Sequence, residues 1–195
     1  MGKQRRAVFL DRDGVLIADR GLLVHPDDIQ ILPGVPRAML RLHQAGFALV
    51  VISNQAVVAR GLISEADLLN LEHILDRELQ ALGAPPLDGF YYCPHHPSAT
   101  LPAYRLDCAC RKPRPGLLLR ASQELDLDLS ASFMVGDRPT DLQAGSKAGC
   151  RGIWIQSGRH AEQPIETPEP LDPEVTASFV CDTLLTAANW ILEGP

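Results

Sequence analysis

The chain has 195 residues, of which 46% are hydrophobic, a length and composition that suit one domain and exclude a disordered chain. With 18 basic and 24 acidic residues, its net charge is −6, and the absence of a long basic stripe excludes a typical nucleic-acid-binding protein. No apolar run is long enough for a signal peptide or a membrane span, so we expect a soluble, cytoplasmic protein without membrane partners.

The first predicted element is a buried strand over 7–10 that ends at Asp11 and Asp13. Four apolar residues suit a strand of a parallel sheet, and ligands bind beyond the carboxyl ends of such strands. Two carboxylates at that place repel each other, and a divalent cation would relieve the repulsion. Gly14 permits the tight turn that follows. On this motif alone, a loop with two solvated acids remains the alternative.

Helices and strands alternate along the rest of the chain, which predicts a doubly wound parallel α/β sheet. Apolar runs predict further strands over 48–52, 89–93, 133–135, 152–155 and 178–180. Apolar periodicity and end signals predict helices over 35–45, 64–82, 117–125 and 141–148, and a last helix that Asp182 caps and that runs to Leu192. We expect irregular structure over 14–33, 53–61 and 94–110, and a mobile surface loop over 158–175.

Three later motifs place polar side chains beside the acid pair. Ser53 follows an apolar strand, Lys112 stands just before a helix start, and Asp137 follows the strand over 133–135. The order of acid pair, hydroxyl, lysine and acid resembles that of the haloacid-dehalogenase-like (HAD) phosphohydrolases over residues 7–155. The resemblance implies a single Mg²⁺-dependent phosphatase domain over 1–195, with a small loop insert and no large cap domain. A small chain without a large cap suggests an open site and a monomer.

Four residues with zinc-binding chemistry frame the loop over 93–110. Cys93, His95, Cys108 and Cys110 form a set of three thiols and one imidazole, which suits tetrahedral zinc. All four positions would be filled by protein, so the zinc would be structural, and it would order a loop that has little apolar content. His96 is the competing ligand, and reduced cysteines at strand ends are the alternative for the whole set.

The chemistry of a HAD-like phosphatase implies a role for each group in these motifs. Asp11 would attack phosphorus and form an aspartyl phosphate, while Asp13 would act as general acid and then as general base. Ser53 and Lys112 would stabilise the phosphoryl group. Mg²⁺ would bind the carboxylates of Asp11 and Asp137 and the backbone carbonyl of Asp13.

The segments over 59–61, 91–97 and 108–113 resemble one HAD family, the D-glycero-D-manno-heptose 1,7-bisphosphate 7-phosphatases. That family serves the synthesis of nucleotide-activated heptose (ADP- or GDP-heptose) for the lipopolysaccharide core. The resemblance implies a small phosphorylated sugar as substrate, bound by Asp19, Arg20, Gly21, Leu22, Ser53, Asn54, Gln55, Ala56 and Arg111. A second phosphate would be bound by Arg60, Arg111 or Arg114, and Arg138 and Asp141 would orient the metal shell, with Arg138 also near the substrate.

Two alternatives stay open. The family usually reads D-R-D-G-T-I-N, whereas this chain has Val15, Leu16 and Ile17 in the last three positions. Histidinol-phosphate phosphatases are close relatives that often carry an apolar residue where Ile17 stands, so histidinol phosphate is the alternative substrate. An inactive, zinc-stabilised HAD binding module is the other alternative. For Asp141, a helix N-terminal acid is the competing interpretation.

Overall fold

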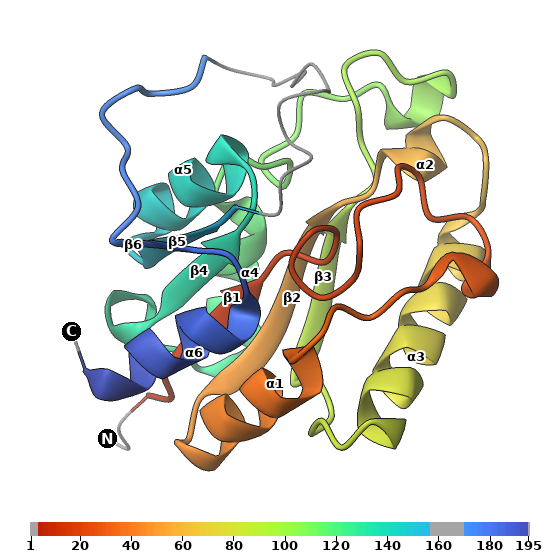
Figure 1. The fold of residues 1–195 in the computed structure, drawn as a ribbon. Coiled ribbons are helices and arrows are strands. Elements are labelled where there is room, and N and C mark those ends of the chain that lie inside the picture. Colours follow the sequence, from red (N-terminus) through yellow and green to blue (C-terminus); the bar gives the residue numbers. More distant parts are fainter. Residues whose placement is uncertain (1–3, 157–169, 195) are drawn as a thin grey trace.

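The computed structural model describes residues 4–156 and 170–194. Within these residues, six parallel strands form one sheet in the order β3-β2-β1-β4-β5-β6 (Figure 1). The doubly wound parallel sheet is therefore confirmed. The strands are β1 (Ala7–Leu10), β2 (Ala48–Asn54), β3 (Gly89–Cys93), β4 (Phe133–Gly136), β5 (Arg151–Ile155) and β6 (Phe179–Cys181).

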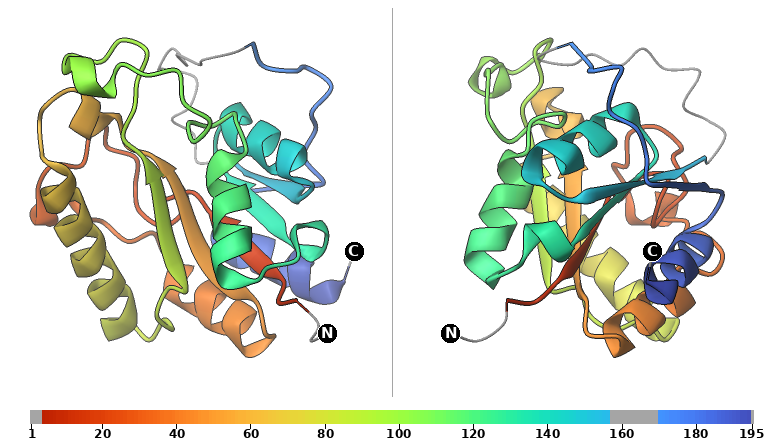
Figure 2. Two further views of the ribbon diagram at one scale, coloured as in Figure 1. Left: turned by 180° about the vertical axis from the view of Figure 1, so that it is seen from behind. Right: turned by 90° about the vertical axis from the view of Figure 1, so that its left-hand side faces the viewer.

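Helices cover both faces of the sheet, as buried parallel strands require. Side chains alternate along β1, so that Val8 and Leu10 join one apolar core while Ala7 and Phe9 join the other. The first core is covered by α1 (Val35–Gln44), α3 (Glu65–Ala81) and α6 (Leu184–Glu193). The second core is covered by α4 (Gly116–Leu125) and α5 (Pro139–Ala148), which face the reader in the view from behind (Figure 2).

The strand order creates a switch point at β1. From β1 the chain continues to β2 on one side, whereas β4 joins on the other side of β1 only after β3 has formed the edge. In such sheets ligands bind outside the carboxyl ends of the strands at the point where the order reverses. Asp11 follows β1, Ser53 lies near the end of β2 and Asp137 follows β4. The topology therefore brings these three side chains to one edge of the sheet.

Some local predictions need correction. The expected loop over 53–61 contains a short helix, α2 (Ala56–Ala59), whose last three residues are buried, so tertiary packing overrides its shortness. Thr183, not Asp182, caps α6, because its side chain accepts a hydrogen bond from the Thr186 backbone N–H. Ser64 caps α3 as predicted, in a capping box with Asp67.

The predicted mobile loop over 158–175 lies mostly outside the described residues. Within the part that the structure describes, no helix combines the length and apolar character needed to cross a membrane.

Candidate functional site

Three buried acids meet at the carboxyl edge of the sheet. Asp11, Asp137 and Asp141 are at most 6% exposed, and each offers a carboxylate oxygen within 4.8 Å of the others. Gly14 permits this close arrangement: its φ is +81°, and a Cβ at this position would lie 1.5 Å from Asp137 Oδ2. Burial, and then the charges of Asp11 and Asp141, raise the pKa of Asp137 to about 9. Burial likewise raises the pKa of Asp11.

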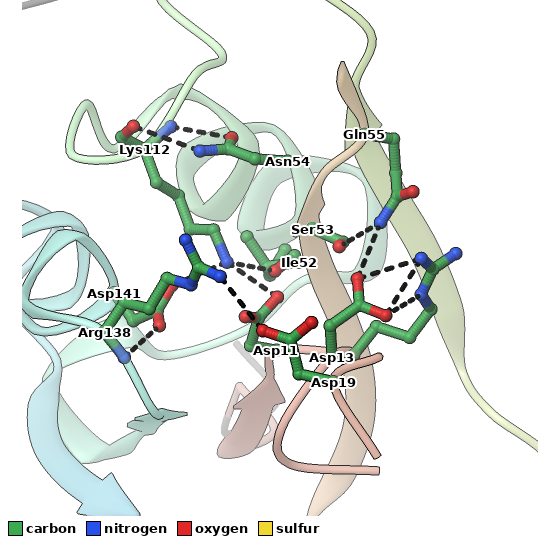
Figure 3. A network of polar contacts seen from close by, with 11 residues as sticks. Asp11, Asp13, Asp19, Ile52, Ser53, Asn54, Gln55, Lys112, Arg138 and Asp141 are labelled. Atoms are coloured by element: carbon green, nitrogen blue, oxygen red, sulfur yellow. Dashed lines mark hydrogen bonds and ion pairs between the residues drawn. The ribbon is translucent and has the colours of Figure 1, made fainter. Parts of the chain in front are cut away.

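Lys112 supplies a positive charge at this cluster. It is 2% exposed, and its Nζ lies 2.9 Å from Asp11 Oδ1 and 2.6 Å from Asp141 Oδ1 (Figure 3). Its backbone N–H donates to Asn54 Oδ1 at 3.1 Å, and its carbonyl accepts from Asn54 Nδ2 at 3.2 Å. The ammonium group also donates to the Ile52 carbonyl at 2.8 Å. The lysine is therefore held at both its backbone and its charged end.

Asp13 faces a different set of partners. Arg12 Nη2 donates to both of its carboxylate oxygens, at 3.0 and 2.9 Å, and Arg12 Nε donates to Oδ1 at 3.2 Å. Gln55 Nε2 donates to Asp13 Oδ2 at 3.3 Å and to Ser53 Oγ at 2.7 Å (Figure 3). Arg12 Nη1 is held in turn by Glu72 Oε1 at 2.6 Å. The two acids of the first motif thus point into separate networks.

The acid cluster fits a hard divalent cation. Asp11, Asp137 and Asp141 bring three carboxylates together with only one buried ammonium group beside them among the described residues. Mg²⁺ is bound through a few carboxylates, with substrate phosphate and water completing its shell. Asp141 also accepts a hydrogen bond from the Arg138 backbone N–H at 2.9 Å, in the capping box of α5. Both interpretations of Asp141, helix cap and member of the cluster, therefore describe its contacts.

A cavity of about 460 Å³ opens over these groups. Most of the predicted substrate contacts line it, and so do Arg12, Leu23, His96 and Thr140, which we did not predict as substrate contacts. Arg20 instead lines a smaller neighbouring cavity of about 100 Å³. Arg114 binds the Cys108 carbonyl and Asp107, away from the lining. The predicted residues in the lining are Asp11, Asp13, Asp19, Gly21, Leu22, Ser53, Asn54, Gln55, Ala56, Arg60, Arg111, Lys112, Arg138 and Asp141.

Two arginines that line the cavity bind different segments of the chain. Arg138, at the start of α5, donates to Asp19 Oδ2 at 3.0 Å and so ties the segment after β1 to the edge of β4 (Figure 3). Arg111 is 8% exposed and donates from Nη1 to the His95 carbonyl at 3.0 Å. Arg138 therefore contacts the segment over 14–33, and Arg111 contacts the predicted zinc loop.

The predicted zinc ligands converge. Ligand atoms of Cys93, His95, Cys108 and Cys110 all lie within 4.8 Å of one another. Cys93 Sγ is 3.6 Å from Cys108 Sγ and 3.1 Å from Cys110 Sγ, and His95 Nδ1 is 3.4 Å from Cys110 Sγ. The hydrogen bond that Cys93 and Cys110 share lowers the pKa of Cys110 to about 5 and raises the pKa of Cys93, while burial raises the pKa of Cys108. The cluster therefore favours one thiolate, the form of cysteine that zinc binds.

His96 is turned elsewhere. Its Nδ1 accepts the Ser98 backbone N–H at 3.1 Å, and its ring lines the cavity. The four-residue set with His95 thus fits a closed structural zinc site.

The sequence analysis missed Arg12 and Glu72. Arg12 is only 1% exposed and Glu72 6%, although both residue types are rarely buried. A signal was present: Glu72 stands four residues after Leu68 and three before Leu75, inside the apolar stripe of the predicted helix. Such a glutamate needs a buried cation as partner, and Arg12 at the end of a buried strand supplies it.

Comparisons with known proteins identify relatives of this chain. A family model described as HAD-hydrolase-like matches residues 109–187. D-glycero-β-D-manno-heptose-1,7-bisphosphate 7-phosphatase of Photorhabdus laumondii is 49% identical over 91% of this chain and 90% of its own length. The protein of the same name from Escherichia coli K12 is 39% identical over 100% and 92%.

A solved structure extends the similarity to three dimensions. The crystal structure of D,D-heptose 1,7-bisphosphate phosphatase from B. bronchiseptica, complexed with magnesium and phosphate, has a TM-score of 0.79. It is 35% identical and matches 97% of this chain and 99% of that one.

Proposed function

This chain belongs to the D-glycero-β-D-manno-heptose-1,7-bisphosphate 7-phosphatase family of HAD-like enzymes, and we propose that it hydrolyses the 7-phosphate of that sugar bisphosphate. The product would enter the synthesis of ADP- or GDP-heptose for the lipopolysaccharide core. The proposal rests on one observation: besides Arg12, which is bound to Asp13 and Glu72, the cavity that holds Asp11 and Lys112 is lined by three further arginines, Arg60, Arg111 and Arg138. A substrate with two phosphates needs positive charge at more than one place.

In the first proposed step, a carboxylate oxygen of Asp11 attacks phosphorus. The new bond joins Asp11 to the phosphoryl group while the bond from phosphorus to the sugar oxygen breaks. Asp13 gives its proton to the departing sugar oxygen, which leaves as an alcohol. Lys112 Nζ, already 2.9 Å from Asp11 Oδ1, stabilises the negative charge of the transferring group. Ser53, in β2 beside Asp13's partner Gln55, would donate its hydroxyl hydrogen to a phosphoryl oxygen.

In the second step, water replaces Asp11 on phosphorus. Asp13, now ionised, accepts a proton from the water, a phosphorus–oxygen bond forms, and the bond to Asp11 breaks to release inorganic phosphate. Magnesium, when bound by the Asp11 and Asp137 carboxylates and the Asp13 backbone carbonyl, would supply positive charge for the phosphoryl oxygens. Zinc on the 93–110 loop would supply order rather than chemistry, since all four ligands are protein groups.

The alternative substrate has weaker support. Ile17, the residue that suggested histidinol phosphate, is 1% exposed and belongs to the apolar core. It lines only the small cavity beside the main one. The inactive binding module would have lost part of the acid and lysine set, whereas the structure brings Asp11, Asp137 and Lys112 together.

The test is phosphate release with Mg²⁺ from the heptose 1,7-bisphosphate and, in parallel, from histidinol phosphate. We expect preferred turnover of the sugar bisphosphate, a product that keeps its 1-phosphate by ³¹P NMR, and no turnover with Asp11→Asn. Arg111→Met should raise KM for the bisphosphate. Preference for histidinol phosphate would overturn the substrate, and no turnover of any monoester would support the binding module.

We also propose a domain organisation, an oligomeric state and a cellular location for the protein. We propose that residues 1–195 act as one domain and, because the chain is small and its described residues form no large cap, as a monomer. We propose a cytoplasmic location because all five cysteines are free thiols, and four-ligand zinc sites of this kind need reduced cysteines.

A further inference from the structure

Glu72 is a buried acid that the proposed mechanism does not use. It lies on α3 between Leu71 and Leu75, at a position where the neighbouring side chains pack into the apolar core. It is 6% exposed, and among the described residues its Oε2 has no hydrogen-bond partner. An ionised carboxylate in such a place destabilises the fold unless a partner compensates for it. Glu72 therefore calls for an explanation besides packing.

The ion pair of Glu72 leads toward Asp13. Glu72 Oε1 accepts from Arg12 Nη1 at 2.6 Å, while Arg12 Nε and Nη2 hold both carboxylate oxygens of Asp13. Glu72 lines neither of the two cavities at the site, so it acts on the site through Arg12. The three side chains form a continuous chain of contacts from the helix to the proposed general acid.

The planar guanidinium of Arg12 explains how its contact with Glu72 could fix the position of Asp13. Arginine presents a rigid fork of N–H donors, so fixing one end of the fork fixes the plane of the other donors. A carboxylate held through both oxygens cannot rotate freely about its terminal torsion. Catalysis by a general acid depends on holding its oxygen at hydrogen-bond distance from the atom that receives the proton.

We infer that Glu72 is a positioning residue which, by fixing the guanidinium of Arg12, orients the Asp13 carboxyl group toward the leaving oxygen of the substrate. The inference rests on the proposed role of Asp13 as general acid. Glu72 would therefore accelerate one step, protonation of the departing alcohol. It would not affect substrate binding or the attack by Asp11.

The test uses the leaving group. A sugar or other alkyl alcohol needs a proton as it departs, whereas 4-nitrophenolate leaves readily without one. We compare kcat/KM of wild type and Glu72→Gln with Mg²⁺ for an alkyl monoester, the heptose bisphosphate, and for 4-nitrophenyl phosphate. Because kcat/KM reports only steps up to the first irreversible one, the later work of Asp13 as base does not enter it.

We expect Glu72→Gln to lose about tenfold in kcat/KM for the alkyl ester and less than about twofold for the aryl ester, a fraction of the effect of full acid catalysis. Glu72→Asp keeps the charge on a shorter side chain, so it should recover part of the loss. Glu78→Gln makes the same change at an exposed position of α3 and should leave both rates unchanged. Equal losses on both esters, or no loss on either, would overturn the inference.

Asp13→Asn separates this inference from the function on which it rests. If Asp13→Asn discriminates strongly between the two esters and Glu72→Gln does not, only the role of Glu72 fails. If Asp13→Asn does not discriminate either, Asp13 is not the general acid and the inference falls with that assignment. Thermal unfolding of each variant shows whether it is folded, and Glu72→Asp carries the test if Glu72→Gln is not.

Discussion

Two buried cations flank the end of β1, and each lies between two carboxylates. Lys112 contacts Asp11 and Asp141, while Arg12 contacts Asp13 and Glu72. Both cations are at most 2% exposed. We call Lys112, Asp11 and Asp141 the lysine side, and Arg12, Asp13 and Glu72 the arginine side. All three residues of the lysine side line the cavity, whereas Glu72 of the arginine side does not.

The difference follows from the two side chains. Lysine carries a compact charge that can approach a phosphoryl oxygen, and arginine carries a fork that fixes the geometry of a carboxylate. The same arrangement of charges therefore suits contact with the substrate on one side and orientation of a catalytic group on the other. The two sides should respond differently to mutation.

Loss of the lysine should have the largest effect. We expect Lys112→Met to lower kcat/KM by about 10³-fold, because one preorganised charge on the reacting group is typically worth that much. The loss should be similar for alkyl and aryl phosphates, since the proposed mechanism assigns Lys112 to the phosphoryl group and not to the leaving oxygen. Steady-state kinetics on both esters checks it, with Lys147→Met, an exposed lysine of α5, as control. A loss confined to the alkyl ester would remove the distinction between the two sides.

Disruption of the zinc cluster should weaken the lysine side selectively. Cys108→Ser removes one ligand next to the chain that carries Arg111 and Lys112, and Arg111 is bonded to the His95 carbonyl. We expect loss of bound zinc, a fall in the melting temperature of about 10 °C and a loss in kcat/KM of at least about tenfold. Zinc content by atomic emission, thermal unfolding and kinetics measure these effects.

In Cys108→Ser, the ratio of kcat/KM for the alkyl ester to kcat/KM for the aryl ester shows whether the loop supports the lysine side alone. It should stay near that of wild type, because Arg12 follows β1 and Glu72 lies on α3, and the two bind each other and Asp13 rather than the loop. Cys181→Ser makes the same chemical change outside the cluster and should retain zinc. A changed ratio would show that the loop also supports the arginine side.

Sequence could predict the lysine side better than the arginine side. Asp11, Asp137 and Lys112 stand at strand ends or before a helix, where polar residues after apolar runs identify a ligand site. Paired cysteines and a histidine that bracket one loop predicted a zinc site, and the four predicted ligands lie together in the structure. Arg12 and Glu72 lie 60 positions apart and meet only through packing of α3 on the sheet. The apolar stripe of the helix indicates that Glu72 is buried, but it does not identify Arg12 as the partner.

The ends of the helices also show which features depend on packing between distant elements. The capping box at Ser64 was predictable from side chains within one turn, whereas α2 forms because its apolar residues are buried by distant elements. Thr183 and Asp182 are both good caps, and the tertiary path of the chain decides which one is used. Caps within one turn are therefore predictable from local chemistry, whereas packing between elements decides whether α2 forms and which residue caps α6.

Replacing the guanidinium group of Arg12 with an ammonium group should have an intermediate effect on kcat/KM. Arg12→Lys keeps the charge, but a single ammonium group cannot reproduce the planar fork that holds Asp13 and Glu72 together. We expect kcat/KM for the alkyl ester to fall by about 10- to 100-fold, with a smaller loss for 4-nitrophenyl phosphate. Arg37→Lys, at an exposed position of α1, is the control. If Arg12→Lys matched wild type on both esters, the charge alone would suffice and the fork would have no role.

The smallest expected effect is on stability and its dependence on pH. Burial raises the pKa of Glu72 from its usual 4.5 to about 7 in the folded protein, against the opposing influence of Arg12. The folded state therefore holds the proton of Glu72 more tightly than the unfolded state, and wild type loses stability as pH rises through this window. The amide introduced by Glu72→Gln does not titrate. The melting temperature of Glu72→Gln minus that of wild type should thus increase between pH 5 and 8.

The size of this increase is bounded by the shift in pKa, which corresponds to at most about 3 kcal/mol, or several degrees. Only the slope is predicted, because an amide that binds Arg12 less well than the carboxylate would lower the difference at every pH by a constant amount. Glu78→Gln should give a flat difference, and a flat or falling difference for Glu72→Gln would contradict the prediction. A rising slope together with the loss of alkyl-ester turnover would mean that ionisation of Glu72 costs stability, although Glu72 holds Asp13 in place through Arg12.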